Sequence, residues 1–387
     1  MEHLVNNEVR NIQISGIRQF FNMVANYPDA IQLTIGQPDF PTPVHIKEAG
    51  KKAINENKTS YTKNAGIDEL CVAATTFLEK KYQLAYDPKT EVITTIGASQ
   101  GIDITLRTIL EQGSEVILPG PVYPAYEPII KMCGAVPIYI DTRETDFKLT
   151  ARQIEAAITD KTRCVFLPYP SNPTGCILTE EELADIAKVL KERDIFVVSD
   201  EIYSELVYGQ EHRSIASFPG MKDKTIIING LSKSHSMTGW RIGFVFAPEN
   251  ISKHILKVHQ YNVSCASSVS QHAAIEALTV GIDDALSMRA EYEKRRDYVY
   301  DRIVSMGIDV VKPEGAFYLF PSIEKFGMNS DDFALKLLQE AKVACVPGTA
   351  FSSYGEGYLR LSYAYSMDIL EEGCNRIEKF IIEQDQN

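Results

Sequence analysis

The sequence predicts an α/β fold in which helices cover both faces of a mainly parallel sheet, followed by a smaller α+β region. Three observations support this prediction. Between about residues 45 and 247, short β-branched runs alternate with helical patterns. These runs are apolar throughout, which is typical of strands buried on both faces. After residue 247, long charged helical stretches replace the regular alternation.

Helices are expected between the strands of the sheet. The predicted helix Glu180–Glu192 has acidic residues in its first turn and basic residues in its last, as the helix dipole favours. Two further helices are expected at Ser99–Leu110 and Tyr123–Met132. The expected strands are Glu91–Thr95, Glu115–Leu118, Val136–Ile140, Cys164–Leu167, Ile195–Ser199, Thr225–Asn229 and Ile242–Phe246.

The second region is expected to combine long helices with a few short strands. Since chain ends often lie close together, the N-terminal segment is expected to pack with it. We therefore predict a large domain over residues 45–285 and a small domain formed by 1–44 and 286–387. The helices expected after residue 247 are Ser267–Val280, Asp283–Met306, Asp331–Ala341 and one from Met367, and the expected strands are Gly315–Phe320, Val343–Val346 and Tyr358–Ser362.

Composition excludes several classes of partner. The net charge of −13 argues against nucleic acid, because phosphate binding needs a basic surface. No apolar run is long enough to span a membrane, and the N-terminus does not resemble a signal peptide. Seven scattered cysteines without a Cys-x-x-Cys pair fit reduced thiols in a cytoplasmic protein. No His-Glu-x-x-His or Gly-x-Gly-x-x-Gly motif supports a zinc site or a nicotinamide cofactor.

The segment Asn229–Gly243 contains the most informative pair of residues. Lys233 directly follows a predicted buried strand, and Arg241 comes eight residues later. A lysine that attacks a carbonyl needs a sheltered position where its neutral amine is favoured. The planar fork of an arginine suits a phosphate. The alternative is a solvated loop with two ordinary charges.

Other polar residues follow the predicted strands, at the edge where parallel α/β sheets bind ligands. Asn172 lies in a proline-rich loop, and Asp200 and Tyr203 follow the strand Ile195–Ser199. Ala98 and Ser99 open a helix, whose free backbone N–H groups attract anions. Each has an ordinary alternative: a turn asparagine, an N-cap at Ser99 or Asp200, or a packed tyrosine.

Two further residues complete the candidate set. Tyr123 lies between prolines and would make a stacking platform, although core packing is the commoner use of tyrosine. Arg360 is a charge inside the apolar run Tyr358–Ser362, so it needs an anion, either a substrate carboxylate or a structural ion-pair partner. Together, the candidates describe a pocket for a flat, phosphorylated, aldehyde-bearing heteroaromatic cofactor.

These residues resemble the class I/II aminotransferases, pyridoxal-phosphate enzymes of fold type I. The resemblance runs from about Leu33 to the C-terminus. Within the family, the chain most resembles the aspartate/aromatic-type subgroup, and there the N-acetyl-LL-diaminopimelate aminotransferases of lysine biosynthesis. The motifs that carry the resemblance are Ser171–Gly175, Asp200–Tyr203, Ser232–Lys233, Gly239–Gly243 and Arg360–Ser362.

The resemblance implies a role for each residue. Lys233 would bind the cofactor aldehyde covalently and later carry the substrate proton. Asp200 would keep the pyridine nitrogen protonated, while Tyr203 and Asn172 would contact the ring oxygen and Tyr123 would stack on the ring. The implied phosphate ligands are Ala98, Ser99, Ser232, Arg241 and, from the neighbouring subunit of an obligatory homodimer, Tyr61. The implied ligands of the substrate α-carboxylate are Arg360, Asn172 and the backbone of Gly36.

One position departs from the family pattern. Many relatives have serine or threonine three residues before the lysine, where this chain has Gly230.

The reaction that the resemblance implies is a ping-pong transfer of an amino group between an L-amino acid and a 2-oxo acid. Alternatives are a carbon–sulfur β-lyase of the same fold and, more distantly, a non-enzymatic regulator. The substrate's distal end is not readable, although Arg18 or Lys63 would suit a second carboxylate.

Overall fold

The computed structural model describes residues 1–385. Its main sheet has seven strands in the order β2-β8-β7-β6-β5-β3-β4. Strand β8 pairs antiparallel with β2 and β7, and the other neighbours pair in parallel, which confirms a mainly parallel sheet. The strands are β2 (Val92–Thr95), β3 (Glu115–Gly120), β4 (Val136–Asp141), β5 (Thr162–Leu167), β6 (Phe196–Asp200), β7 (Thr225–Gly230) and β8 (Gly243–Phe246).

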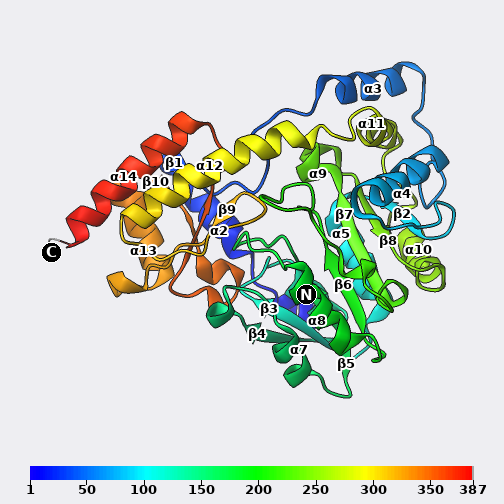
Figure 1. The fold of residues 1–387 in the computed structure, drawn as a ribbon, viewed down its shortest axis with the longest axis horizontal. Coiled ribbons are helices and arrows are strands. Elements are labelled where there is room, and N and C mark those ends of the chain that lie inside the picture. Colours follow the sequence, from blue (N-terminus) through cyan, green and yellow to red (C-terminus); the bar gives the residue numbers. More distant parts are fainter. Residues whose placement is uncertain (386–387) are drawn as a thin grey trace.

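Both faces of this sheet are covered by helices (Figure 1). In β7, Ile226 and Ile228 belong to one buried cluster and Ile227 to another, and all three are fully buried. This explains why the strand sequences are apolar throughout. One face packs against α5 (Gly97–Ile109), α6 (Tyr126–Met132) and α10 (Glu249–Val263), and the other against α4 (Asp68–Tyr82), α7 (Ala151–Ala157), α8 (Glu180–Leu190) and α11 (Ser268–Thr279). Helix α3 (Val44–Asn55) packs on α11.

A second group of elements joins the two ends of the chain. Strand β1 (Ile31–Gln32) pairs in parallel with β10 (Val343–Ala344). A three-stranded antiparallel sheet has the order β11-β12-β9, with β9 at Tyr318–Leu319, β11 at Val346–Pro347 and β12 at Leu359–Ser362. The helices around it are α2 (Gly16–Val24), α12 (Ala285–Ser305), α13 (Ser330–Lys336) and α14 (Met367–Asp385).

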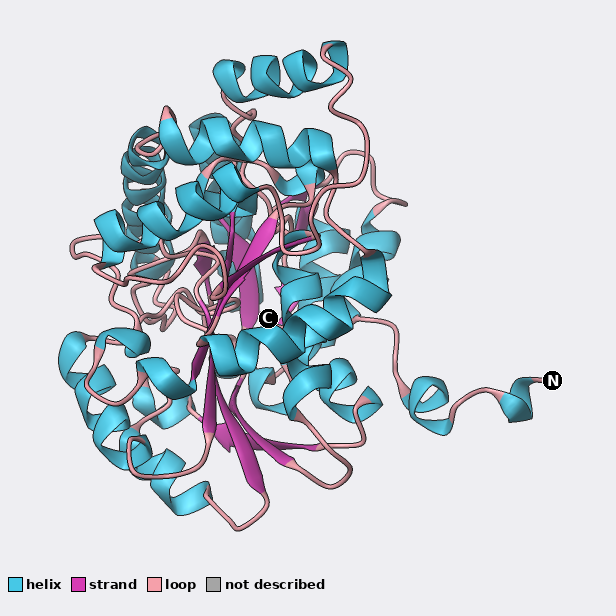
Figure 2. Cartoon of the chain, turned by 90° about the vertical axis from the view of Figure 1, so that its right-hand side faces the viewer, coloured by secondary structure: helices cyan, strands magenta, loops and turns pink. Residues whose placement is uncertain are grey.

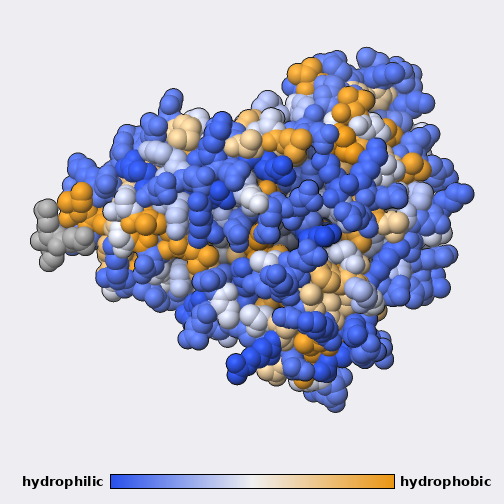
Figure 3. Space-filling model, viewed as in Figure 1, coloured by the Kyte–Doolittle hydropathy of each residue, from blue (hydrophilic) through white to orange (hydrophobic). Residues whose placement is uncertain are grey.

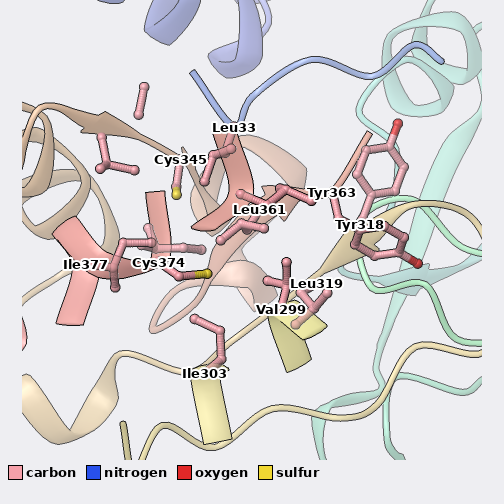
Figure 4. Close-up of a cluster of buried hydrophobic side chains, with 14 of the residues drawn as sticks. Leu33, Val299, Ile303, Tyr318, Leu319, Cys345, Leu361, Tyr363, Cys374 and Ile377 are labelled. Carbon is pink, nitrogen blue, oxygen red and sulfur yellow. The ribbon is translucent and has the colours of Figure 1, made fainter. Parts of the chain in front are cut away.

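The hydrophobic core of this group brings distant segments together. Figure 4 shows Leu33, from the N-terminal part, beside Leu361 and Cys345, with Ile303 from α12 and Ile377 from α14 around them. Tyr318 lies at the edge of this cluster (Figure 4). The core therefore fixes β9 and β12 relative to each other, and both strands border the site described below.

Several predicted elements are shorter than expected. The helix predicted from Tyr123 begins at Tyr126, because Pro124 disfavours a helical conformation in the residue before it. Tyr123 thus stays in the loop. The strand predicted at Val343–Val346 divides at Cys345 into β10 and β11, which pair with different partners. The helix predicted to Ala341 becomes a π-helix over Leu337–Ala341.

The surface is mostly polar. On the face in Figure 3, hydrophilic residues cover most of the area and hydrophobic ones are scattered between them. Figure 2 shows the first short helices, including α1 (Asn7–Asn11), projecting from the body. Within residues 1–385, no helix combines the length and hydrophobicity of a membrane span. That same part of the chain contains no cluster of three or more side chains suited to binding a metal ion.

Candidate active site

A cavity of about 1050 Å³ opens at the carboxyl ends of the parallel strands. Residues after β3, β5, β6 and β7 line it, together with the first turn of α5, part of the N-terminal segment, and β9 and β12. The structure therefore brings together every candidate residue found in the sequence except Tyr61 and Lys63. Those in the lining are Gly36, Ala98, Ser99, Tyr123, Asn172, Asp200, Tyr203, Ser232, Lys233, Arg241 and Arg360.

Lys233 is held in a partly buried position in the cavity. It lies on the short helix α9 (Leu231–Ser234), directly after β7, and its Nζ donates to the carbonyl of Gly36. The ammonium lies 5.6 Å from the Tyr203 ring centroid, and it forms no salt bridge within residues 1–385. Burial, reinforced by the nearby cations Arg360 and Arg241, lowers the pKa of Lys233 to about 8. A neutral amine is therefore accessible near physiological pH.

Asp200 is a buried carboxylate at the end of β6. Its Oδ2 accepts a hydrogen bond of 2.8 Å from the Tyr126 hydroxyl, and its Oδ1 accepts one of 3.2 Å from the backbone N–H of Ile202. No salt bridge neutralises it within the described residues. Burial raises the pKa of Asp200 to about 6. Since a buried carboxylate is costly without a positive partner, the site is suited to a cationic group of a ligand.

Arg360 is a buried guanidinium without an acidic partner. It lies on β12 with 2% of its surface exposed, and the rings of Tyr318 and Phe351 flank it at 4.5 and 4.9 Å. It donates to Asn172 Oδ1 at 2.9 Å and to the carbonyl of Thr34 at 2.6 Å, while its Nε has no partner. The ion pair considered from the sequence is absent among residues 1–385. A ligand carboxylate would supply the missing charge.

The other end of the cavity carries several unused hydrogen-bond donors. Ala98 and Ser99 lie in the first turn of α5, where backbone N–H groups are free. The hydroxyls of Ser99 and Ser232 have no hydrogen-bond partner in the described part of the chain. Arg241 lies against Gly97, where a Cβ would come within 2.5 Å of Nη2. This arrangement of free N–H groups, hydroxyls and a guanidinium suits a phosphate.

Comparison with known proteins identifies the chain. The model of the family "Aminotransferase class I and II" matches residues 28–377. The chain belongs to this family. It is therefore a pyridoxal-phosphate-dependent transaminase, and its fold is that of fold type I.

Several relatives match nearly the whole chain. The "Probable N-acetyl-LL-diaminopimelate aminotransferase" of Bacillus subtilis (strain 168) is 64% identical, with 99% of this chain and 97% of that protein covered. The crystal structure of the aromatic aminotransferase from Pyrococcus horikoshii OT3 is 41% identical, with a TM-score of 0.90 and 95% and 99% coverage. The aspartate aminotransferase from Thermus thermophilus with maleate is 32% identical, with a TM-score of 0.91 and 97% and 99% coverage.

Gly230 has a packing reason in this aminotransferase. A Cβ at position 230 would lie 3.0 Å from Gly243 Cα and 3.0 Å from the carbonyl oxygen of Ile242, so a side chain there would require the neighbouring backbone to move by a few tenths of an ångström. Thr238, whose hydroxyl has no partner among residues 1–385, lines the cavity instead. A hydroxyl is thus available near Arg241 from a different position.

Three residues lie away from the cavity or at its margin. Tyr61 is 88% exposed and does not line the cavity of its own chain. Lys63 is exposed and forms a salt bridge with Asp68. Arg18, in contrast, is an exposed residue of α2 that lines the cavity. Of the two cations considered for the distal end of a substrate, only Arg18 lies at the site.

Sequence reasoning missed three residues that contact the candidate set. Tyr126 holds Asp200, and the Tyr318 hydroxyl lies 2.8 Å from that of Tyr203. The third is Thr238, whose carbonyl accepts a hydrogen bond of 2.9 Å from Arg241. Tyr126 and Tyr318 are 74 and 115 positions from their partners, so no local pattern indicates these contacts. For Tyr126, the only available signal was its place after the strand that ends at Gly120.

Proposed function

We propose that this aminotransferase transfers the amino group of N-acetyl-LL-diaminopimelate to 2-oxoglutarate in lysine biosynthesis, by a ping-pong mechanism that uses pyridoxal 5′-phosphate. The main support is the position of Lys233, which has no acidic partner within residues 1–385 and shares one cavity with Asp200 and Arg360. The relative of 64% identity supports the choice of substrate. The alternative is a carbon–sulfur β-lyase of the same fold.

The described residues fit this cofactor. Lys233 offers an amine for the aldehyde, and the uncompensated carboxylate of Asp200 suits a protonated ring nitrogen. Asn172 retains a free Nδ2 for the ring oxygen, which Tyr203 would share, and Tyr123 offers a half-buried ring for stacking. The residues that would hold the phosphate are Ala98, Ser99, Ser232 and Arg241. When bound, the cofactor supplies an electron sink for the bond that breaks at the substrate α-carbon.

The protein's own contribution is charge, orientation and one proton carrier. The neutral Nζ of Lys233 would take the α-proton and return it in the reverse half-reaction. Arg360, with Asn172 and the backbone of Gly36, would fix the substrate α-carboxylate and thereby orient the α-carbon towards Lys233. The buried aromatic rings of Tyr203 and Phe317, 5.6 and 5.7 Å from this amine, would limit water around it.

We further propose a homodimer with shared active sites. Tyr61 is 88% exposed on a loop that is tied to Ser264 through Asn64. Leu4 and Ile14, in the projecting N-terminal segment, are 66% and 67% exposed. We propose that a partner subunit covers these apolar side chains and that Tyr61 reaches the phosphate end of the partner's cavity. The seven free cysteines fit a cytoplasmic enzyme.

The division into two domains is also a proposal. The large domain would comprise residues 45–285 and the small domain residues 1–44 and 286–387, of which 386 and 387 lie outside the described residues. The buried clusters support this division. One is formed mainly by Phe20, Val24, Leu33 and residues from 288 to 381, and the other three lie mainly between residues 46 and 278.

Borohydride trapping of the cofactor-loaded enzyme tests the central residue. Reduction followed by peptide mass mapping is expected to place the pyridoxyl group on Lys233. A tag on another residue would contradict the proposal.

The reaction itself is tested by incubating the enzyme with N-acetyl-LL-diaminopimelate and 2-oxoglutarate. Glutamate formation supports transamination, whereas release of pyruvate and ammonia from a cysteine conjugate, without amino transfer, would favour the β-lyase.

A further inference from the structure

The cavity extends beyond the residues needed for the cofactor and the α-carboxylate. Its outer part is lined by the N-terminal residues 11–18, by Phe21 and by one side of α6. Most of this lining is apolar, with contributions from Ile12, Ile14 and Ile129. Since cavities of about 300–1,000 Å³ hold drug-sized ligands, a volume of about 1050 Å³ accommodates a substrate with a long side chain beside the cofactor.

Arg18 is the unpaired charge of this outer part. The two other charged residues there, Glu127 and Lys131, form a salt bridge with each other, and Glu127 also accepts a hydrogen bond of 2.8 Å from Tyr139. Arg18 forms no salt bridge, hydrogen bond or cation–π contact within residues 1–385. Its guanidinium is thus free to bind an anion that enters the cavity.

The helix that carries Arg18 packs against the elements next to Arg360. Phe20 and Val24 anchor α2 in the core, and a Cβ at Gly16 would come within 2.9 Å of Ala350 Cβ, so the start of the helix packs closely. Helix α2 also contacts β11, in which Val346 pairs with Arg360 of β12. Two guanidiniums without acidic partners therefore lie on connected elements around one cavity.

We propose that Arg18 binds a second carboxylate at the distal end of the amino donor, so that the enzyme selects extended amino acids that are anionic at both ends. This inference rests on the proposed function, because it assumes that Arg360 binds the α-carboxylate. N-acetyl-LL-diaminopimelate has this chemistry. N6-acetyl-L-lysine has the same chain and acetamido group without the distal carboxylate, which makes it a matched probe.

The test compares kcat/KM for these two donors in the wild type, Arg18→Gln and Arg18→Lys. A charge-assisted hydrogen bond predicts that the wild type favours the dicarboxylate by about 10- to 100-fold. Arg18→Gln is expected to lose this preference through a raised KM, with N6-acetyl-L-lysine unaffected, and Arg18→Lys to retain part of it. Arg10→Gln, in the same N-terminal segment but outside the lining, is the control. A preference that persists in Arg18→Gln would overturn the proposal.

A binding measurement separates this inference from the proposed reaction. Calorimetry of the cofactor-loaded protein with pimelate and heptanoate requires no turnover. Tighter binding of pimelate that disappears in Arg18→Gln supports the subsite, even if N-acetyl-LL-diaminopimelate proves not to be a donor, in which case only the proposed substrate fails. Equal affinity for the two acids in the wild type would overturn the subsite, even if transamination is observed.

Discussion

The hydroxyl of Tyr126 lies 2.8 Å from Oδ2 of Asp200, and both side chains are buried. Tyr126 is in the first turn of α6 and Asp200 is the last residue of β6, so the contact connects a helix on one face of the sheet with its carboxyl edge. The hydrogen bond to Tyr126 lowers the pKa of Asp200, in opposition to the larger effect of burial. Tyr126 is therefore a positioning residue that keeps Asp200 ionised.

Replacement of Tyr126 by phenylalanine is expected to weaken the enzyme most at low pH. Without the hydrogen bond, the pKa of Asp200 rises above its value of about 6, so Asp200 becomes protonated at a higher pH. The acidic limb of the pH profile for cofactor binding by the apo form should shift upwards, with recovery of binding above neutral pH. Tyr86→Phe is the matched control, because the Tyr86 hydroxyl is buried, has no hydrogen-bond partner within residues 1–385 and lies outside the cavity. Superimposable profiles would refute the role of Tyr126.

Cofactor binding by the apo form should follow the ionisation of Lys233. Only the neutral amine attacks an aldehyde, and the pKa of Lys233 is lowered to about 8. The rate of loading, followed by absorbance, is thus expected to rise with pH and level off above about 8.

Substitution of Arg360 tests why the pKa of Lys233 is low. Arg360 lowers the pKa of Lys233, so Arg360→Gln should move the midpoint to higher pH. Arg376→Gln, in an exposed salt bridge of α14, should leave the midpoint unchanged. An unchanged midpoint in Arg360→Gln would show that this charge does not act on the amine.

Subunit mixing tests whether the active sites are shared. Lys233→Ala should lose more than the roughly 10²–10⁴-fold expected for an acid–base group alone, because cofactor attachment is lost too. Tyr61→Ala should bind the cofactor weakly. In a mixed dimer, one site combines an intact Lys233 with an intact Tyr61 from the partner, so activity should reappear when the two inactive variants are refolded together. Activity no higher than the sum of the separate variants would contradict shared sites.

A side chain at position 230 is expected to destabilise the protein. In Gly230→Ser, the new Cβ would meet Gly243 Cα and the Ile242 carbonyl, both at 3.0 Å. Such overpacking typically costs about 1–3 kcal/mol, which urea unfolding of the apo protein would reveal. Gly239→Ser is the control, since a Cβ there meets no atom within 4 Å. Equal free energies of unfolding for the two variants would contradict this prediction and show that the neighbouring backbone moves to accommodate the side chain.

Much of the architecture was predictable because both faces of the main sheet are buried. That burial makes the strand sequences apolar throughout, so strands β2 to β8 could be recognised in the sequence as apolar runs. The reversed direction of β8 was not visible, since a buried antiparallel strand has the same composition. In the smaller region, Val343–Val346 reads as one strand, although its two ends pair with different partners.

In the site too, some residues could be recognised from the sequence and others could not. Lys233, Asp200 and Asn172 were recognisable because each follows a strand, where the fold places ligands. The partners of these residues were not recognisable, because Tyr126, Thr34 and Tyr318 come from distant elements. The meaning of Arg360 was also open in the sequence, since only the three-dimensional neighbourhood shows that no carboxylate accompanies it.

The hydrogen bonds of Arg360 to Asn172 and to the carbonyl of Thr34 have a wider consequence. They join β12 to the loop after β5 and to the segment after β1, so a substrate carboxylate bound by Arg360 would connect three distant parts of the chain. Ligand at a hundredfold excess over its Kd adds about 2.7 kcal/mol to folding stability. Substrate would accordingly act as a folding ligand, and the saturated enzyme would resist unfolding more than the substrate-free one.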